Sequence, residues 1–171
     1  MVMPIRIYGD PLLREKAMPI EDIDDGIRKL AQDMIDTMRA GDGIGLAATQ
    51  VGRLVRLVVI EGHAVDDDDP EPLAFVNPEI VELSRSRSTF EEGCLSVPDI
   101  RSDVERPDAL TLRYRTLDGE EITEEANGMY ARVIQHEIDH LDGRLFVDHL
   151  GAARRNLLRK RLRELQRRSK E

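Results

Sequence analysis

The sequence predicts an α+β fold in which helices pack against mostly antiparallel β-sheets, with one helix at the centre. Three observations support this prediction. Apolar residues recur every three or four positions near both ends of the chain and again around residue 135. Short runs rich in Val, Ile and Leu, bounded by Gly, Pro, Asn and Asp, lie between these segments. No internal repeat and no linker divides the 171 residues, so we expect a single domain over residues 1–171.

The first expected element is a helix over about residues 26–40, where apolar residues follow helical spacing. Asp24 or Asp25 is placed to cap its start, and Gly41 is placed to end it. The run 54–60 is rich in Val and Leu and predicts a buried strand. The segment AVDDDDPEP that follows predicts a solvated acidic loop.

Antiparallel sheet is expected in the middle of the chain. Two strands, 73–76 and 79–83, are separated by an Asn-Pro pair. A hairpin of 109–115 with 120–123 surrounds an Asp-Gly turn.

Two helices are expected in the C-terminal part. Asn127 is placed to cap the first of them, and Gly143 is placed to end it. The second is expected over about 151–168, with one face formed by Leu157, Leu158, Leu162 and Leu165.

Charge is distributed unevenly. Residues 152–171 hold nine Lys or Arg against two Glu, a net charge of +7, which leaves −16 on the rest of a chain whose total is −9. The basic tail could contact nucleic acid phosphates, whereas the acidic body should not.

One cysteine excludes an internal disulfide, and the N-terminal segment contains no apolar stretch typical of a signal peptide or a membrane span. A cytoplasmic location and no contact with a membrane are therefore expected.

The most informative motif is QHEIDH, in which His136 and His140 are four residues apart and Glu137 follows the first histidine. Residues four apart lie on one face of a helix, so both imidazoles could hold one metal ion. Glu137 would then stand within reach of a water molecule on that ion. The motif is typical of metal-dependent hydrolases. The alternative is that both histidines are ordinary core residues with hydrogen bonds of their own.

A third ligand is needed, and Cys94 in EEGCLSVP is the best candidate. A thiolate binds borderline metals well and adds a negative charge that neutral imidazoles lack. Three protein ligands with an open fourth position are typical of catalytic metal sites. A lone cysteine can instead be a small buried apolar residue.

Two other patterns fail in their context. The chain follows the zinc-peptidase pattern H-E-x-x-H-x-x-G-x-x-H as far as Gly143, but Phe146 stands in place of the last histidine. Residues 43–48 match the dinucleotide pattern G-x-G-x-x-A, which needs a strand before it and a helix after it. The expected order is the reverse, so no nucleotide cofactor is expected. Such small residues favour close approach of the backbone to an extended ligand, with Gln50 as an amide donor.

GIGLAATQ, EGCLS and QHEIDH, in this order and spacing, resemble the three signature motifs of the peptide deformylase family. The resemblance covers nearly the whole chain, and the basic C-terminal helix is similar to that of bacterial members. It implies a catalytic domain that removes the N-formyl group from the formylmethionine of newly synthesised polypeptides and releases formate. It also implies a contact of the basic helix with the ribosome.

The resemblance further implies that Cys94, His136 and His140 bind one divalent metal ion, with Glu137 as general base and acid. Fe²⁺ is the ion expected in the cell, and Zn²⁺ or Ni²⁺ can occupy the same site. Sequence does not fix the choice, because Fe²⁺ stands below Zn²⁺ in affinity for such ligands and supply also matters.

The Gln50 amide and the Leu95 backbone N–H are implied as donors to the oxyanion. Glu92 and Asp139 are candidates for orienting the ligands, unless they are solvated charges. The candidates for substrate binding are Gly43, Ile44, Gly45, Phe90, Arg101, Met129 and Val133. The glycines would offer their backbone to the peptide and the apolar residues would form a methionine pocket, although each apolar residue could also be plain core.

Two other functions are considered. A metallopeptidase would use the same helix to cleave internal peptide bonds, with a third ligand other than Cys94. A catalytically silent ribosome-binding protein would typically lack Glu137, Cys94 or Gln50, and all three are present.

Overall fold

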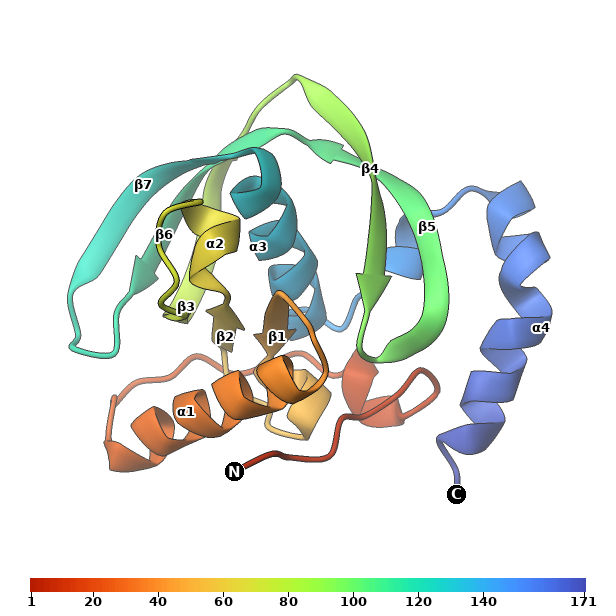
Figure 1. The fold of residues 1–171 in the computed structure, drawn as a ribbon, viewed down its shortest axis with the longest axis horizontal. Coiled ribbons are helices and arrows are strands. Elements are labelled where there is room, and N and C mark those ends of the chain that lie inside the picture. Colours follow the sequence, from red (N-terminus) through yellow and green to blue (C-terminus); the bar gives the residue numbers. More distant parts are fainter.

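A computed structural model describes all residues 1–171 and confirms the α+β class. Helix α3 (Gly128–Leu141) lies at the centre of the molecule, between a five-stranded and a two-stranded sheet (Figure 1). All strand pairs in both sheets are antiparallel. The larger sheet has the order β1-β2-β3-β6-β7, formed by Gly45–Ala47, Leu57–Ile60, Leu73–Leu83, Ala109–Arg115 and Glu121–Asn127. The smaller sheet is the hairpin of β4 and β5, formed by Arg87–Cys94 and Val97–Pro107.

The predicted first helix matches α1 (Asp25–Ala40) to within one residue, because its caps are local signals. The Asp24 side chain accepts a hydrogen bond from the backbone N–H of Ile27 at 2.9 Å, and Gly41 follows the last turn. No helix in the structure combines the length and the apolar character needed to cross a bilayer. The remaining helical elements are η1 (Pro11–Arg14), η2 (Ala48–Val51), α2 (Gly62–Val65), η3 (Phe146–His149) and α4 (Ala152–Arg168).

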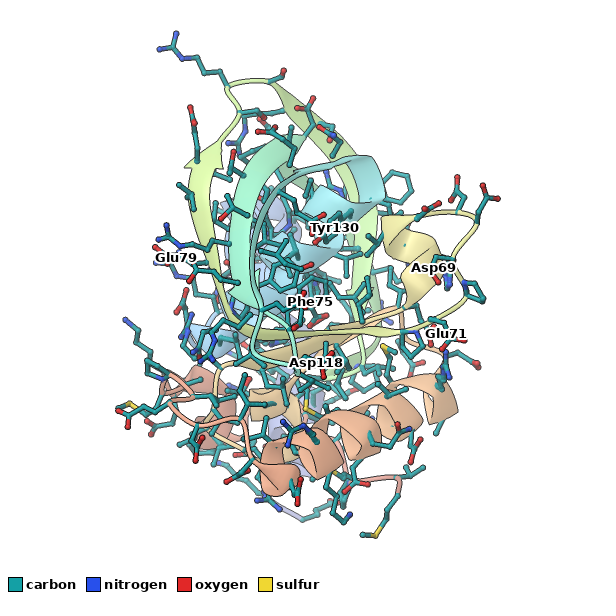
Figure 2. The ribbon with its side chains drawn as sticks, turned by 90° about the vertical axis from the view of Figure 1, so that its left-hand side faces the viewer. Asp69, Glu71, Phe75, Glu79, Asp118 and Tyr130 are labelled. Atoms are coloured by element: carbon teal, nitrogen blue, oxygen red, sulfur yellow. The ribbon has the colours of Figure 1, made fainter.

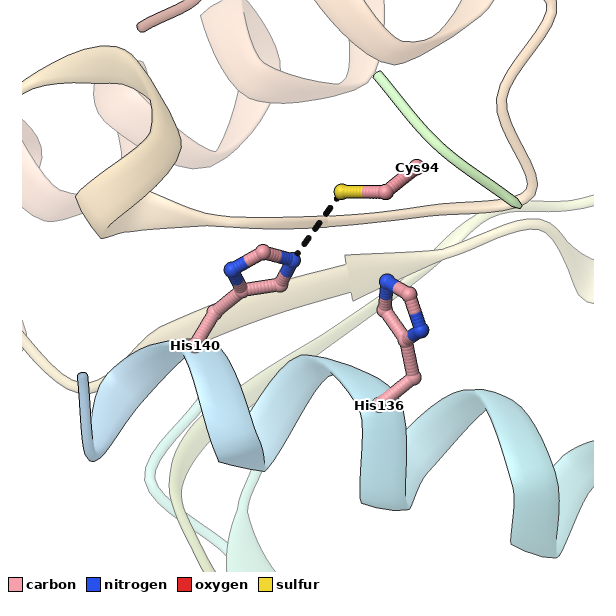
Figure 3. Close-up of side chains that lie close together, drawn as sticks. All are labelled: Cys94, His136 and His140. Atoms are coloured by element: carbon pink, nitrogen blue, oxygen red, sulfur yellow. Dashed lines mark hydrogen bonds between the residues drawn. The ribbon is translucent and has the colours of Figure 1, made fainter. Parts of the chain in front are cut away.

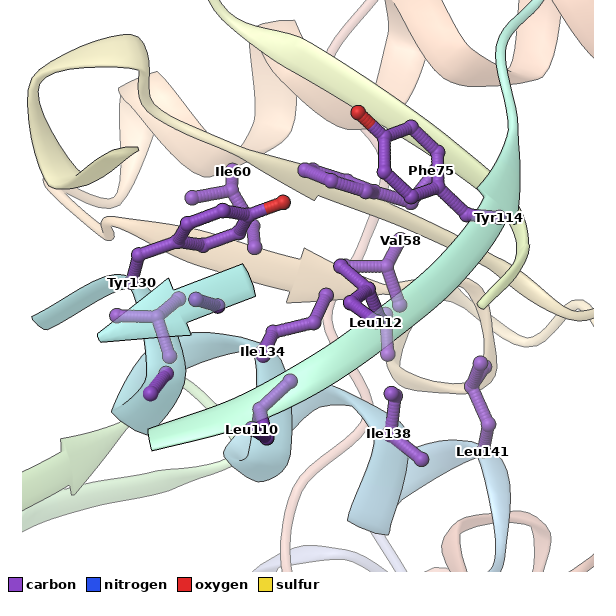
Figure 4. Packing of buried hydrophobic residues seen from close by; sticks show 14 of the residues in the cluster. Val58, Ile60, Phe75, Leu110, Leu112, Tyr114, Tyr130, Ile134, Ile138 and Leu141 are labelled. Atoms are coloured by element: carbon purple, nitrogen blue, oxygen red, sulfur yellow. The ribbon is translucent and has the colours of Figure 1, made fainter. Parts of the chain in front are cut away.

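The core consists of three apolar clusters, of which only the first contains residues of α3. The first lies between the larger sheet and α3, where Phe75, Leu112, Tyr130 and Ile134 pack together (Figure 4). The second lies between α1 and the face of β1 and β2 that points away from α3. The third joins β5, η3 and α4. Because α3 is covered from several sides, eleven of its fourteen residues are buried, including charged and polar ones.

Three details of the sheets differ from the prediction. The two predicted strands form one strand, β3, whose pairing with β6 is irregular between Val76 and Glu79. At this irregularity Asn77 has a positive φ of 52°, and its side chain forms hydrogen bonds with both backbone groups of Ile20. Strand β7 continues to Asn127 instead of ending at residue 123. Strands β4 and β5 were not predicted individually, since β4 is mostly polar and exposed. The expected acidic loop follows α2, and Figure 2 shows Asp69 and Glu71 at the periphery of the molecule.

Helix α4 packs against β5 and η3 through Leu158, Leu162 and Leu165, which are all buried. The prediction that Leu157 shares this face was wrong, because its side chain is 73% exposed. Adjacent residues on a helix point about 100° apart, so Leu157 and Leu158 cannot both face the body. The helix is therefore docked by a narrow apolar stripe, with its charges outside.

Truncating this stripe should destabilise the protein. We expect Leu162→Ala to lower the free energy of unfolding by about 2–5 kcal/mol, because it leaves a cavity in the third cluster. The matched control Leu157→Ala on the exposed face should change it by less than about 0.5 kcal/mol. Urea unfolding of both variants measures the difference, and equal effects would show that α4 is not docked in solution.

Candidate metal centre and active site

The three expected metal ligands meet where the end of β4 approaches α3. Cys94 is the last residue of β4, and the two histidines extend from one face of α3 (Figure 3). One ligand atom from each of Cys94, His136 and His140 lies within 4.8 Å of the others, and Cys94 Sγ is 3.3 Å from His140 Nε2. A thiolate and an imidazole on one tetrahedral zinc ion would stand roughly 3.6 Å apart. The spacing therefore fits a single divalent ion.

Each histidine directs one ring nitrogen toward the place where a single metal ion would lie. His136 Nδ1 lies 2.8 Å from Glu92 Oε1, and because a carboxylate only accepts, Nδ1 is the donor and Nε2 is the ring nitrogen left to bind a metal ion. His140 is fully buried, and burial together with the nearby charge of His136 lowers its pKa, which favours the neutral form that binds metals. The donor set is thus that of a metal centre.

Glu137 stands beside the ligands without a partner of its own. Its side chain is buried, Oε1 makes no hydrogen bond, and this atom is 4.0 Å from His140 Nε2. Burial, with a smaller contribution from the charge of Glu92, raises the pKa of Glu137 to about 7 against the opposing effect of His136. A carboxyl group with a pKa near neutrality can both take and return a proton.

Strand β1 passes very close to this carboxylate. A Cβ atom at Gly45 would lie 2.6 Å from Glu137 Oε2 and 2.9 Å from Val133 Cγ1. No residue larger than glycine fits there without displacing Glu137. Gly45 of the first motif is thus explained by the close packing of β1 against Glu137.

Gln50, in η2, is held behind the thiolate. Its Oε1 accepts a hydrogen bond from the Ala47 backbone N–H at 2.9 Å, which turns Nε2 toward Ser96 Oγ at 3.1 Å and Cys94 Sγ at 3.5 Å. The amide therefore presents its hydrogens on the side of the ligands. Ser96, which the sequence reasoning did not single out, fixes this orientation from within the second motif.

A cleft of about 600 Å³ opens in front of the ligands. Its wall includes Glu137, Cys94, His136 and Leu95, whereas Gln50 and His140 lie behind the surface because they are almost fully buried. Ile44, Phe90 and Met129 are each at least 40% exposed, so they are not plain core. All seven expected substrate-binding residues line the cleft: Gly43, Ile44, Gly45, Phe90, Arg101, Met129 and Val133.

The two acidic candidates have different partners. Glu92 contacts His136 directly, and although burial raises its pKa, hydrogen bonds from His136 and Arg106 outweigh this and hold the pKa well below its usual range. Asp139 instead contacts Arg106 at 2.9 Å and His149 at 2.8 Å, and makes no hydrogen bond to a metal ligand. Of the two expected orienting residues, the structure places only Glu92 against a ligand.

Two buried arginines around Glu92 were missed in the sequence. The side chains of Arg106 and Arg132 are 3% and 8% exposed. Arginine is rarely buried, so its letter in a sequence suggests surface. The only available signal was the position of Arg132 four residues before His136, which places both on one face of α3.

The site has the features of a metal-dependent hydrolase. A cysteine and two histidines surround one point, an unpaired buried carboxylate lies beside them, and a cleft opens in front of them. The comparisons with known proteins specify the family. The family model for polypeptide deformylase matches residues 2–156. The peptide deformylase of Brucella suis biovar 1 (strain 1330) is 47% identical over 164 residues, which cover 96% of this chain and 93% of that protein.

Solved structures agree. The crystal structure of peptide deformylase from Thermotoga maritima is 40% identical, covers 88% of this chain and 99% of its own, and superposes with a TM-score of 0.83. The peptide deformylase of Plasmodium falciparum is 35% identical, covers 98% of this chain and 97% of its own, and gives a TM-score of 0.91. The chain belongs to the polypeptide deformylase family.

The single thiol provides a direct test of the metal centre. Metal-free protein should react with one equivalent of a thiol reagent, since Cys94 is the only cysteine and is partly exposed. Loading with Zn²⁺ should slow this reaction at least about tenfold, because coordination occupies the thiolate. Cys94→Ala should lose most of the bound metal in elemental analysis. A reaction rate that does not depend on zinc would remove Cys94 from the ligand set.

Proposed function

We propose that this chain removes the formyl group from the N-terminal formylmethionine of newly synthesised polypeptides and releases formate. The observation that carries the proposal is the unpaired buried carboxylate of Glu137, which stands at the ligand end of a cleft lined by the expected peptide-binding residues. Membership of the family supports the same reaction.

Cys94, His136 and His140 would hold one divalent ion. When bound, the ion supplies Lewis acidity, which polarises the formyl carbonyl and makes water easier to deprotonate. Glu137 takes a proton from the attacking water while a bond forms between the water oxygen and the formyl carbon. When the bond between carbon and nitrogen breaks, Glu137 returns the proton to the nitrogen, and the peptide leaves with a free amino terminus.

Gln50 and Leu95 would stabilise the negative charge on the formyl oxygen during this reaction. The Gln50 amide faces the ligands because Ala47 and Ser96 fix its two ends. Leu95 follows Cys94 in the chain and lines the cleft, and the resemblance to the family implies its backbone N–H as the second donor. Loss of one such donor typically raises a barrier by about 2.7–4 kcal/mol.

The cleft also supports a peptide substrate. Strand β1 is an edge strand, since it pairs only with β2, and the cleft is lined by Gly45 of this strand and by Gly43 just before it. A peptide could add to this edge as a further strand. Ile44, Phe90, Met129 and Val133 would then surround the methionine side chain. Arg101, which pairs with Glu91 at 2.8 Å on the rim, would contact the peptide further along.

Ferrous iron is the ion that we propose for the cell, with Zn²⁺ or Ni²⁺ able to replace it, and the cytoplasm is the proposed location. A soft thiolate with two imidazoles accepts all three metals. Purification without oxygen followed by elemental analysis tests the choice, and zinc alone in such a preparation would contradict iron.

The competing function is cleavage of internal peptide bonds. The two activities are separated by incubating the enzyme with formyl-Met-Ala-Ser and with the same peptide lacking the formyl group. Deformylation releases formate from the first and leaves the second intact. Cleavage of the second peptide would favour a metallopeptidase.

Removal of the proton carrier should abolish turnover without emptying the site. We expect Glu137→Gln to reduce the rate of formate release by at least about 10²–10⁴-fold, because general acid and base catalysis contributes that much. The variant should keep its bound metal, since Glu137 is not among the three ligands. A variant with normal turnover would contradict the proposed role of Glu137.

We further propose that α4 contacts ribosomal RNA. Arg155, Arg159 and Arg163 recur every four residues, are exposed, and border a groove of about 770 Å³ together with Tyr8. Their spacing aligns three positive charges on one face of the helix. Arg154, by contrast, donates to Ser102 Oγ and is tied to the body. The free arginines suit phosphate contacts.

Neutralising this stripe should weaken binding to ribosomes. The triple variant Arg155→Gln, Arg159→Gln, Arg163→Gln should bind at least about tenfold more weakly in co-sedimentation, with a reduced dependence on salt. The control Arg53→Gln, Arg85→Gln, Arg144→Gln removes the same charge from exposed positions on the body. Equal binding by the two variants would contradict a specific role of α4.

A further inference from the structure

The metal ligands come from two elements that share no backbone hydrogen bonds. Cys94 belongs to the β4–β5 hairpin, which forms its own sheet, and the histidines belong to α3. No backbone–backbone hydrogen bond joins α3 to either strand of the hairpin. Side chains must therefore set the distance between the thiolate and the imidazoles.

Arg132 is the side chain that binds α3 to both strands at once. Nη1 donates to the Val104 carbonyl of β5 at 2.9 Å and to Glu92 Oε2 of β4 at 2.6 Å. Nη2 donates to the carbonyl and the hydroxyl of Ser88 in β4, at 2.9 and 3.2 Å. Gln135, the other direct tie from α3 to a backbone group of the hairpin, reaches only the carbonyl of Pro107 at the end of β5.

Arg132 also acts on the carboxylate that orients a ligand. Glu92 accepts hydrogen bonds from Arg132, from Arg106 at 2.7 and 3.0 Å, and from His136 Nδ1 at 2.8 Å. A buried carboxylate needs compensating positive charge, and two guanidinium groups provide it. They also occupy its remaining acceptor positions, so the direction of the bond to His136 is fixed.

The same guanidinium lies near the ring of Phe90, with Cζ 5.9 Å from the ring centroid. Phe90 is on the cleft wall, and its ring is otherwise 53% exposed. Arg132 therefore touches the cleft wall and the ligand-orienting carboxylate with one planar group. Its position, one helical turn before His136 and two before His140, continues the ligand face of α3.

We propose that Arg132 is a positioning residue of the metal centre. It sets the affinity and geometry of the ion by fixing Glu92 and the hairpin that carries Cys94 against α3. This inference rests on the metal site proposed above, and it assigns a role to a residue outside the three motifs. It does not require Arg132 to touch substrate or metal.

The test measures metal affinity instead of turnover. Zn²⁺ affinity is determined by competition with a chelating dye for wild type and for Arg132→Met, which removes the charge and the planar fork. We expect a loss of about 10–100-fold, the range found when residues that orient ligands are replaced. The control Arg56→Met removes an arginine that contacts the other end of α3, through the Leu141 carbonyl and Asp142, but no ligand-orienting group. Its zinc affinity should stay within about twofold even if its stability falls.

A spectroscopic reading and a conservative variant complete the test. In the Co²⁺-loaded protein, Arg132→Met should alter the absorption band of the cobalt–thiolate bond, which reports the position of Cys94. Arg132→Lys keeps the charge but cannot bind both strands. This variant should bind zinc several-fold more weakly than wild type. It also allows the proposal to be tested if Arg132→Met does not fold.

A double-mutant cycle with Glu92→Gln separates this role from general stability. Because Arg132 acts partly through Glu92 and partly through Val104 and Ser88, the double variant should lose less zinc affinity than the product of the two single losses. Wild-type affinity in Arg132→Lys, or independent losses in the cycle, would overturn the proposal. Failure of the metal site itself has a different signature, because wild type and Cys94→Ala would then bind zinc equally well.

Discussion

The buried carboxylate of Glu92 is the interaction on which the rest of the site depends. It meets two guanidinium groups and the imidazole of His136 in a space from which water is largely excluded. Exposed ion pairs contribute little to stability, but removal of one member of a buried cluster leaves an uncompensated charge. The cluster joins α3, β4 and β5, and so it fixes the place where a strand of one sheet and the central helix bring their ligands together.

A second constraint is the close approach of the backbone on the other side of the cleft. Gly45 leaves room for the Glu137 carboxylate, and Gly41 and Gly43 leave room for the Leu95 side chain, which any Cβ atom there would meet at about 3 Å. The loop and β1 can thus lie directly against the catalytic candidates. Burial of Glu137 in this packing keeps its carboxyl free of partners and raises its affinity for a proton.

Helix α4 has an apolar face that packs against the body and a basic face that is exposed. Its leucines extend the apolar cluster that also contains Phe146, and the ring of Phe146 stacks on His136 with 6.0 Å between centroids. The residue that departs from the zinc-peptidase pattern therefore supports a ligand instead of supplying one. The basic side chains of the helix are exposed, while the rest of the chain carries a net negative charge.

The sequence by itself determined the class of fold, the approximate bounds of the three long helices and the family, because these depend on local signals. The four short helical elements were not predicted, and Asn127 precedes α3 without capping it through its side chain. Caps at Asp24 and Gly41 set α1 to within a residue, and spacing alone placed both histidines on one face of α3. It also named residues that the structure gathers around one cleft, since three motifs carried them. It did not predict strand β4, whose mostly polar residues are exposed. Strand β5 was also missed, because two of the residues on its buried face are Ser102 and Arg106, which break the apolar alternation.

Only the tertiary structure decided which charges are buried. Arg106 and Arg132 look like surface residues in a chain that is 35% charged, and from the sequence Glu92 could either orient a ligand or be solvated. All three are buried because elements far apart in the sequence pack together around them. The exposure of Leu157 and the continuation of β3 beyond Asn77 were likewise decided by the packing of distant elements. Periodicity reports which residues can share a face, whereas the packing of distant elements decides which face is covered.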